Sequence, residues 1–254
     1  MVEKWDITFP APAGDEARTV YVCLPESYQY NRRRRYPVLY MFDGHNVFFD
    51  EDATYGKSWG MNAYMERTKL PMIIAAVECN HSPDHGRLKE YSPFTFDDPQ
   101  LGHIAGRGRT TMDWWVNVFK KEIDNRYRTL SDRAHTYIAG SSMGGLMSIY
   151  ALVKYNRYFS KAAALSPSVW VAPEKLEHMI NTAPMKPDTV LYIDYGELEF
   201  SNHEQMQEQF YQIINAFFKR HVLLNCRIIP GGTHCEASWE KQLPYFMNTL
   251  TYRP

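Results

Sequence analysis

One segment in the middle of the chain has a sharp structural signature, and it reads Thr136-Tyr137-Ile138-Ala139-Gly140-Ser141-Ser142-Met143-Gly144-Gly145. Its first four residues form a short β-prone run, and residues 143–155 continue with the apolar spacing of a helix. The pattern Gly-x-Ser-x-Gly therefore lies between a strand and a helix, where it makes a tight turn at the edge of a sheet. Ser142 occupies the centre of this pattern and Ser141 does not.

Outward from this turn, short apolar runs alternate with longer amphipathic ones. The runs with strand character are residues 19–24, 38–42, 73–78, 136–139, 161–165, 190–195 and 222–229. The runs with helical spacing are residues 59–67, 112–127, 143–155, 173–181, 203–220 and 236–249. This alternation predicts an α/β fold with a mainly parallel central sheet, helices on both of its faces and an antiparallel hairpin at the start.

Length and composition are those of an ordinary globular protein. The chain has 254 residues, of which 44% are hydrophobic and 22% are charged, and one core commonly organises a chain of this size. Because no repeat or shift in composition marks a boundary, we expect a single domain over residues 1–254. Residues 80–109 are rich in Pro, Gly, His and Asp and lack periodicity, so we expect a long ordered loop there, and such loops are often functional.

Charge and hydropathy exclude two classes of partner. The formal net charge of -1 at pH 7 creates no field that attracts polyanions, so nucleic acid is not an expected partner. The one basic run, residues 32–35, fits a solvated loop. No apolar stretch reaches the ~18 residues that a membrane span needs, and the start lacks a leader pattern. We therefore expect no membrane partner and a cytoplasmic location.

The metal-binding residue types do not form a recognised spacing. Four cysteines are far apart along the chain: Cys23, Cys79, Cys226 and Cys235. The first three lie in or beside apolar runs, which predicts buried free thiols. His81 and His85 have a helical spacing, but Pro83 between them disfavours a helix. We expect neither a metal nor another cofactor.

Ser142 is the candidate nucleophile. The helix that begins after it directs backbone N–H groups and a positive dipole end toward the reacting centre, which favours an oxyanion. The N–H of Met143 is the first donor expected. A plain strand-to-helix turn would need the same glycines, but the strand, turn and helix in this order favour the catalytic interpretation, which requires a base and an acid.

The base should follow the last strand, and the acid should follow the strand before it. His234 lies on the loop after residues 222–229, whereas His221 precedes that strand and would lie at the opposite edge. After residues 190–195, the acid candidates are Asp194, Glu197 and Glu199. We favour Glu199, because a turn residue three past Gly196 has the reach to meet the imidazole and hold its tautomer.

A second oxyanion donor should come from the loop after residues 38–42. There Asp43-Gly44-His45-Asn46 stands where lipases have their glycine-rich donor loop. Gly44 lets the backbone turn toward the site, so the N–H of His45 is the candidate donor. A glycine turn with polar neighbours would have the same sequence.

Taken together, these residues resemble the putative esterase family of α/β hydrolases, which includes enterochelin esterases, feruloyl and acetylxylan esterases, S-formylglutathione hydrolases and mycolyltransferases. The resemblance spans nearly the whole chain, and the segments that carry it are residues 36–40 and 43–48, Arg87 with residues 90–93, residues 140–145, residues 165–170 and His234 with residues 236–239. It implies the α/β-hydrolase fold and chemistry without a cofactor. It also implies that Trp170 lies near the acyl pocket. Tyr91 and Phe94 follow the turn of the long loop toward the same edge, so Trp170 and Tyr91 are candidate substrate contacts, although aromatic residues of this kind are also common in a core. The family frequently has Asp at the acid position, so the glutamates here keep Glu197 open beside Glu199.

The resulting hypothesis is a serine carboxylic-ester hydrolase that acts on a small-molecule ester through an acyl-enzyme. Two alternatives remain open at this point: an acyltransferase to an alcohol acceptor, and a catalytically inactive binding protein on the same fold. Acyl and alcohol specificity depend on the shape of the pocket, which sequence spacing does not give. The oligomeric state is likewise not predicted.

Overall fold

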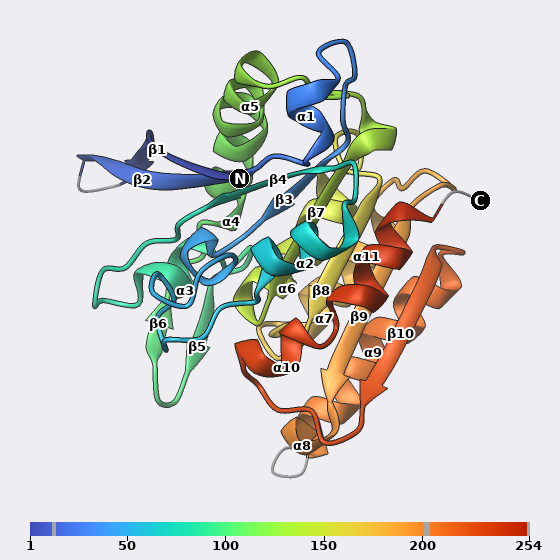
Figure 1. The fold of residues 1–254 in the computed structure, drawn as a ribbon. Helices are drawn as coiled ribbons and strands as arrows, with labels where there is room; N and C mark the ends of the chain where they lie inside the picture. Colours follow the sequence, from blue (N-terminus) through green and yellow to red (C-terminus); the bar gives the residue numbers. More distant parts are fainter. Residues whose placement is uncertain (12–13, 201–203, 253–254) are drawn as a thin grey trace.

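The computed structural model describes residues 1–11, 14–200 and 204–252. Its centre is an eight-stranded sheet in the order β1-β2-β4-β3-β7-β8-β9-β10, shown in Figure 1. The strands are β1 (Val2–Ala11), β2 (Gly14–Cys23), β3 (Val38–Met41), β4 (Ile73–Val77), β7 (Thr136–Ser141), β8 (Lys161–Leu165), β9 (Val190–Gly196) and β10 (Leu223–Ile229). A separate small hairpin pairs β5 (Phe96–Asp98) with β6 (Gly102–Ile104).

The helices connect these strands. They are α1 (Ser27–Tyr30), α2 (Met61–Thr68), α3 (Gly86–Glu90), α4 (Gly108–Trp114), α5 (Lys120–Arg126), α6 (Met143–Lys154), α7 (Pro173–Thr182), α8 (Glu197–Phe200), α9 (Glu204–Lys219), α10 (Glu236–Glu240) and α11 (Leu243–Thr251). Two short 3₁₀ turns, η1 (Gly44–Asn46) and η3 (Arg133–His135), and one π-helical turn, η2 (Trp115–Phe119), complete the elements.

The middle of the sheet is parallel and buried on both faces. From β4 through β3, β7, β8 and β9 to β10, every neighbouring pair is parallel, whereas β1–β2 and β2–β4 are antiparallel. All four residues of β3 and all five of β8 are buried, as expected for central parallel strands covered by helices. The predicted α/β class, the parallel sheet and the N-terminal hairpin are confirmed.

Two hydrophobic clusters, one on each face of the sheet, hold the helices. One cluster joins the sheet to α4, η2, α5, α6, α7 and α9, with Trp115, Leu146 and Phe210 among its members. The other joins it to α2, α10 and α11, through residues such as Met61 and Phe246. In Figure 1 the helices of the second cluster lie in front of the sheet. Because helices cover both faces of the sheet, the loops at the ends of the strands are where a site can be accessible.

Three expectations about local structure are wrong in part. Residues 80–109 contain α3 and the β5–β6 hairpin. The helix expected over 236–249 is two helices, because Pro244 has no N–H for the carbonyl of Glu240 and its ring would clash with that turn. Cys226 is exposed, because β10 is an edge strand, whereas Cys23 and Cys79 are buried; all four thiols are free. The predicted helix 203–220 begins outside the described residues, and α9 covers the part that is described.

Candidate active site

The candidate residues gather at the carboxyl edge of the sheet. β3, β7, β8, β9 and β10 are consecutive neighbours and run parallel, so the loops that leave them lie side by side. His45 follows β3, Ser142 follows β7, and His234 follows β10. The α8 segment that directly follows β9 contains Glu199. Sheet order therefore brings together residues that are up to 189 positions apart in sequence.

Ser142 lies on a strained turn between β7 and α6. Its φ of 57° and ψ of -123° are unusual for a residue with a side chain. The turn needs Gly140, because a Cβ there would lie 2.7 Å from the backbone of Gly144. Ser142 N donates to the Leu165 carbonyl at 2.9 Å, which holds the turn against the end of β8. This backbone presents the hydroxyl at the sheet edge.

His234 and Glu199 form a close pair. The distance from His234 Nδ1 to Glu199 Oε2 is 2.6 Å. The Glu199 side chain is only 6% exposed, whereas that of His234 is 45% exposed. A buried carboxylate of this kind fixes the orientation of the imidazole and leaves Nε2 as the free ring nitrogen.

Glu199 is itself held by two donors. Its Oε1 accepts from Ser166 Oγ at 2.7 Å and from Gly196 N at 3.0 Å. Ser166 Oγ also accepts from Trp239 Nε1 at 3.0 Å, and the Trp239 ring meets that of His234 edge to face at 5.1 Å. Sequence reasoning did not identify Ser166 or Trp239 in this role, because these contacts form only when the segments that follow β8, β9 and β10 lie side by side.

The two other acid candidates have different partners. Glu197 Oε2 accepts from the backbone N–H of Gly231 at 2.9 Å. Asp194 is buried within β9 and accepts from Tyr192 OH at 2.7 Å and from Ser166 N at 3.2 Å. Burial raises the Asp194 pKa to about 7, despite these hydrogen bonds. Among the three acids, the structure brings Glu199 to His234.

Two cavities meet at Ser142. The main cavity, of about 750 Å³, is lined by residues that include His45, Cys79 and His81. The side cavity, of about 460 Å³, is lined by residues that include Met143, Trp170 and Leu198. Four residues line both cavities: Arg87, Leu88, Ser142 and His234.

The hydrogen bond between Ser142 and His234 is not formed in this structure. Over the described residues, the Ser142 hydroxyl pairs with Ser168 Oγ, 3.5 Å away. Catalytic hydrogen bonds in unliganded enzymes are often long and tighten when substrate binds. Ser168 also donates its backbone N–H to the Ser142 carbonyl at 3.0 Å.

The two expected oxyanion donors lie in the first turn of a helical segment near Ser142. Met143 is the first residue of α6, and the first amides of a helix have no acceptor within it. His45 lies in η1, and both residues line cavities that contain Ser142. Burial lowers the pKa of the His45 imidazole, although Asp43 opposes this shift. A neutral imidazole is therefore favoured in this loop.

Arg87 and Asp43 form an ion pair at the start of the turn that contains His45. Arg87 Nε and Nη2 donate to Asp43 Oδ1 and Oδ2, both at 2.7 Å. Burial alone would raise the Asp43 pKa, but the charge and hydrogen bonds of Arg87 outweigh it and hold the pKa below its ordinary value. Asp43 has a positive φ of 56°, so the pair fixes a strained residue. No sequence spacing signals this pair, because its members are 44 positions apart.

The two residues expected to contact substrate, Trp170 and Tyr91, lie in different surroundings. Trp170 lines the side cavity and packs edge to face on Phe96, with ring centroids 5.7 Å apart. Tyr91 is fully buried, so the expectation that it touches substrate is wrong. Its hydroxyl accepts from Asp43 N at 3.3 Å, and its ring packs on Phe42. Tyr91 therefore supports the loop after β3.

One group of residues has the composition of a metal site. Ligand atoms of His45, Cys79 and His81 lie within 4.8 Å of one another. The spacing of His81 and His85 in the sequence did not reveal this group, because Cys79 and His45 follow the ends of two different strands.

No helix in the described ranges is long and apolar enough to cross a membrane.

The sheet order and the serine turn after β7 define a protein of the α/β-hydrolase class. A solved ferulic acid esterase has the same fold, with a TM-score of 0.72, 18% identity and 98% of each chain covered. An uncharacterized protein of Bacillus subtilis, YbbA, is 25% identical over 200 residues, which are 77% of this chain and 73% of that protein. The iron(III) salmochelin esterase of Escherichia coli O6:H1 is 28% identical over 131 residues, or 46% of this chain and 30% of that protein.

Family membership follows from a match over most of the chain. The family model described as "Putative esterase" matches residues 12–250. The chain belongs to the putative esterase family, and it is a carboxylic-ester hydrolase.

Proposed function

We propose that this esterase works through an acyl-enzyme on Ser142. Ser142 Oγ attacks the ester carbonyl carbon while its proton passes to Nε2 of His234. The tetrahedral intermediate then collapses, the bond to the alcohol oxygen breaks, and His234 returns the proton to the leaving alcohol. Water attacks the acyl-enzyme in the same way and releases the acid and the free serine.

One observation carries this proposal: the 2.6 Å contact between His234 Nδ1 and the buried Glu199, beside the cavities that contain Ser142. Glu199 holds Nε2 toward the serine and stabilises the imidazolium that forms. The N–H groups of Met143 and His45 are the proposed donors to the oxyanion. The strained backbone of Ser142 supports the same assignment.

The proposed acyl site is the side cavity. Trp170, Leu198 and Met206 contribute apolar surface there, which suits an aromatic or otherwise apolar acyl group. The names of two relatives, a ferulic acid esterase and a salmochelin esterase, agree with an ester of that kind. The alcohol portion would then extend into the main cavity.

The test compares the two neighbouring serines. Ser142→Ala should abolish turnover of p-nitrophenyl acetate, because the variant lacks the hydroxyl that is proposed to form the acyl-enzyme. Ser141→Ala, which removes a hydroxyl from the end of β7, should retain turnover and thereby controls for folding. Turnover by Ser142→Ala at the wild-type rate would refute the proposal.

A further inference from the structure

We propose that His45, Cys79 and His81 bind one borderline-soft divalent metal ion, such as Zn²⁺, at the wall of the main cavity. Each offers one ligand atom, an imidazole nitrogen or the thiol sulfur, and these atoms lie within 4.8 Å of one another. Over the described ranges, this is the one group of three such residues with this spacing. None of the three is the proposed nucleophile, base or acid, so the metal site does not depend on that assignment. Of the three, His45 alone has another proposed role, and that role uses its backbone N–H rather than its imidazole.

The ligand types match the ion. Two imidazoles and a thiolate are ligands that Zn²⁺ and similar ions prefer over carboxylate-binding ions such as Mg²⁺. Ligand atoms around a tetrahedral zinc ion lie roughly 3.3–3.6 Å apart, so closing the site needs side-chain movements on the order of 1 Å. His81 is exposed and can make such a movement. When the ion binds, the Cys79 thiol proton passes to solvent.

The buried histidine gives an independent reason. Of the described residues, His45 is one of the few with a buried polar atom that lacks a hydrogen-bond partner, its Nδ1. The residue is 5% exposed, and its ring meets the His81 ring edge to face with centroids 4.6 Å apart. A buried nitrogen without a partner is unfavourable, and coordination to a metal ion would satisfy it.

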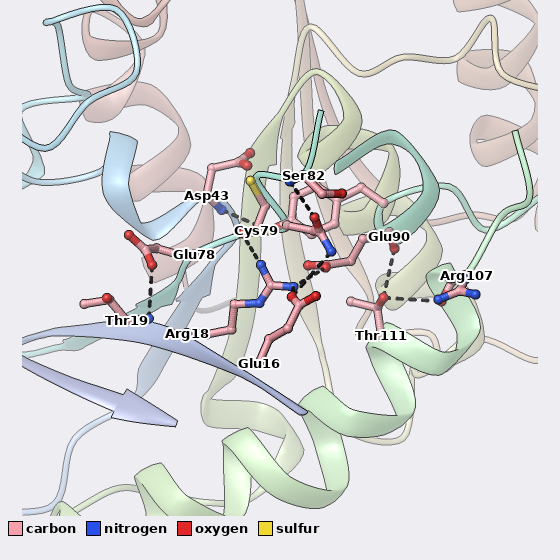
Figure 2. A network of polar contacts seen from close by, with 12 residues as sticks. Glu16, Arg18, Thr19, Asp43, Glu78, Cys79, Ser82, Glu90, Arg107 and Thr111 are labelled. Carbon is pink, nitrogen blue, oxygen red and sulfur yellow. Dashed lines mark hydrogen bonds and ion pairs between the residues drawn. The ribbon is translucent and has the colours of Figure 1, made fainter. Parts of the chain in front are cut away.

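The backbone that carries Cys79 is already held in place. Arg18 donates to the Cys79 carbonyl and contacts Glu90 at 3.1 Å and Glu16 at 2.5 Å, a network that Figure 2 draws beneath the Cys79 side chain. Asn80 Oδ1 accepts from Ser82 N at 2.7 Å, which closes the turn around His81. A fixed backbone with one mobile ligand lowers the cost of forming the site.

Three protein ligands leave a fourth coordination position. The three residues line the main cavity together with Ser142 and His234, so this position opens toward the cavity. A water molecule or an oxygen of a bound ester or acid can occupy it. The bound ion would therefore lie beside the substrate without taking part in the proton transfer assigned to His234.

The experiment measures metal binding by the untagged, reduced protein. Zn²⁺ affinity is measured by competition with a chromophoric chelator, and Co²⁺ serves as a spectroscopic probe of the thiolate. We expect one Zn²⁺ per chain and a thiolate-to-cobalt charge-transfer band. His81→Ala should weaken Zn²⁺ binding at least ~10-fold, and Cys79→Ser should remove the charge-transfer band.

Matched controls separate this site from other histidines and thiols. His85→Asn changes another histidine of the same cavity, and asparagine tolerates its positive φ of 64°, so binding should persist. Cys23→Ser changes another buried free thiol and should keep the cobalt band. Ser142→Ala should bind Zn²⁺ like the wild type.

Because His81 is exposed, His81→Ala tests the site even if Cys79→Ser fails to fold. Wild-type protein that binds no Zn²⁺, or His81→Ala that binds it equally well, would overturn the proposal.

Discussion

Two buried carboxylates each line one of the two cavities that share Ser142, and their partners differ. Glu199 pairs with His234, and Asp43 pairs with Arg87. The two carboxylate side chains are almost equally buried, at 6% and 7% exposed. An imidazole can act as a general base and then as a general acid, whereas a guanidinium remains charged. The partner thus decides whether a buried carboxylate can serve proton transfer or only hold a loop.

The largest effect should come from removing the imidazole of the Glu199–His234 pair. His234→Ala should lower kcat/KM for p-nitrophenyl acetate by at least ~10³-fold, because the variant lacks the proposed base for Ser142. His221→Asn is the control, since His221 precedes β10 and its positive φ of 53° suits asparagine. An inactive His221 variant beside an active His234 variant would mean that the base is misassigned.

A second large effect is expected from the carboxylate of the same pair. Glu199→Gln should reduce kcat by up to ~10⁴-fold, because an amide cannot hold the productive tautomer or stabilise the imidazolium. Glu197→Gln removes a neighbouring charge that contacts Gly231 instead, so its kcat should stay near that of the wild type. Asp194→Asn tests the buried acid of β9 in the same assay. If Glu197→Gln were the impaired variant, the first pair would lose its proposed role.

The Asp43–Arg87 pair should contribute more to the stability of the fold than to kcat. Asp43→Asn leaves the Arg87 guanidinium without its carboxylate and should lower the free energy of unfolding at pH 7 by about 2 kcal/mol. The Asp43 pKa is lowered in the folded protein, so its contribution is complete above the unfolded value of about 3.9. The contribution disappears as pH falls through the lower folded pKa.

Urea unfolding of wild type and Asp43→Asn at several pH values measures this difference directly. The gap between the two proteins should be constant from pH 5 to 7 and narrow below roughly pH 4. The kcat of Asp43→Asn should fall far less than that of Glu199→Gln. Equal stability of the two proteins at pH 7 would show that the Asp43–Arg87 pair does not stabilise the loop.

Much of the fold was predictable because strand and helix have different apolar periods. The prediction for β8 has the observed bounds, and the serine turn lies where Gly-x-Ser-x-Gly predicts it. The N-terminal hairpin and the parallel sheet were likewise predicted. The structure of residues 80–109 was harder to predict, because α3, β5 and β6 are too short to show a repeating pattern of apolar residues.

Of the candidate site, chain order predicted the loops but not the contacts within them. His234 and Glu199 were placed by their positions after strands, and the structure brings them together. Tyr91 was expected at the surface of the site, but aromatic residues in a loop give no sign of which way they face. The Asp43–Arg87 pair and the His45, Cys79 and His81 group depend on tertiary neighbours that no local pattern reports.

The central claim is that Ser142 is the acylated nucleophile, and covalent labelling tests it most directly. A fluorophosphonate reacts with an activated serine, and mass spectrometry of the digested protein identifies the modified residue. We predict one adduct per chain, on Ser142, that forms in step with the loss of esterase activity and is absent from Ser142→Ala. An adduct on Ser141 or another residue, or complete inactivation without an adduct on Ser142, would contradict the account.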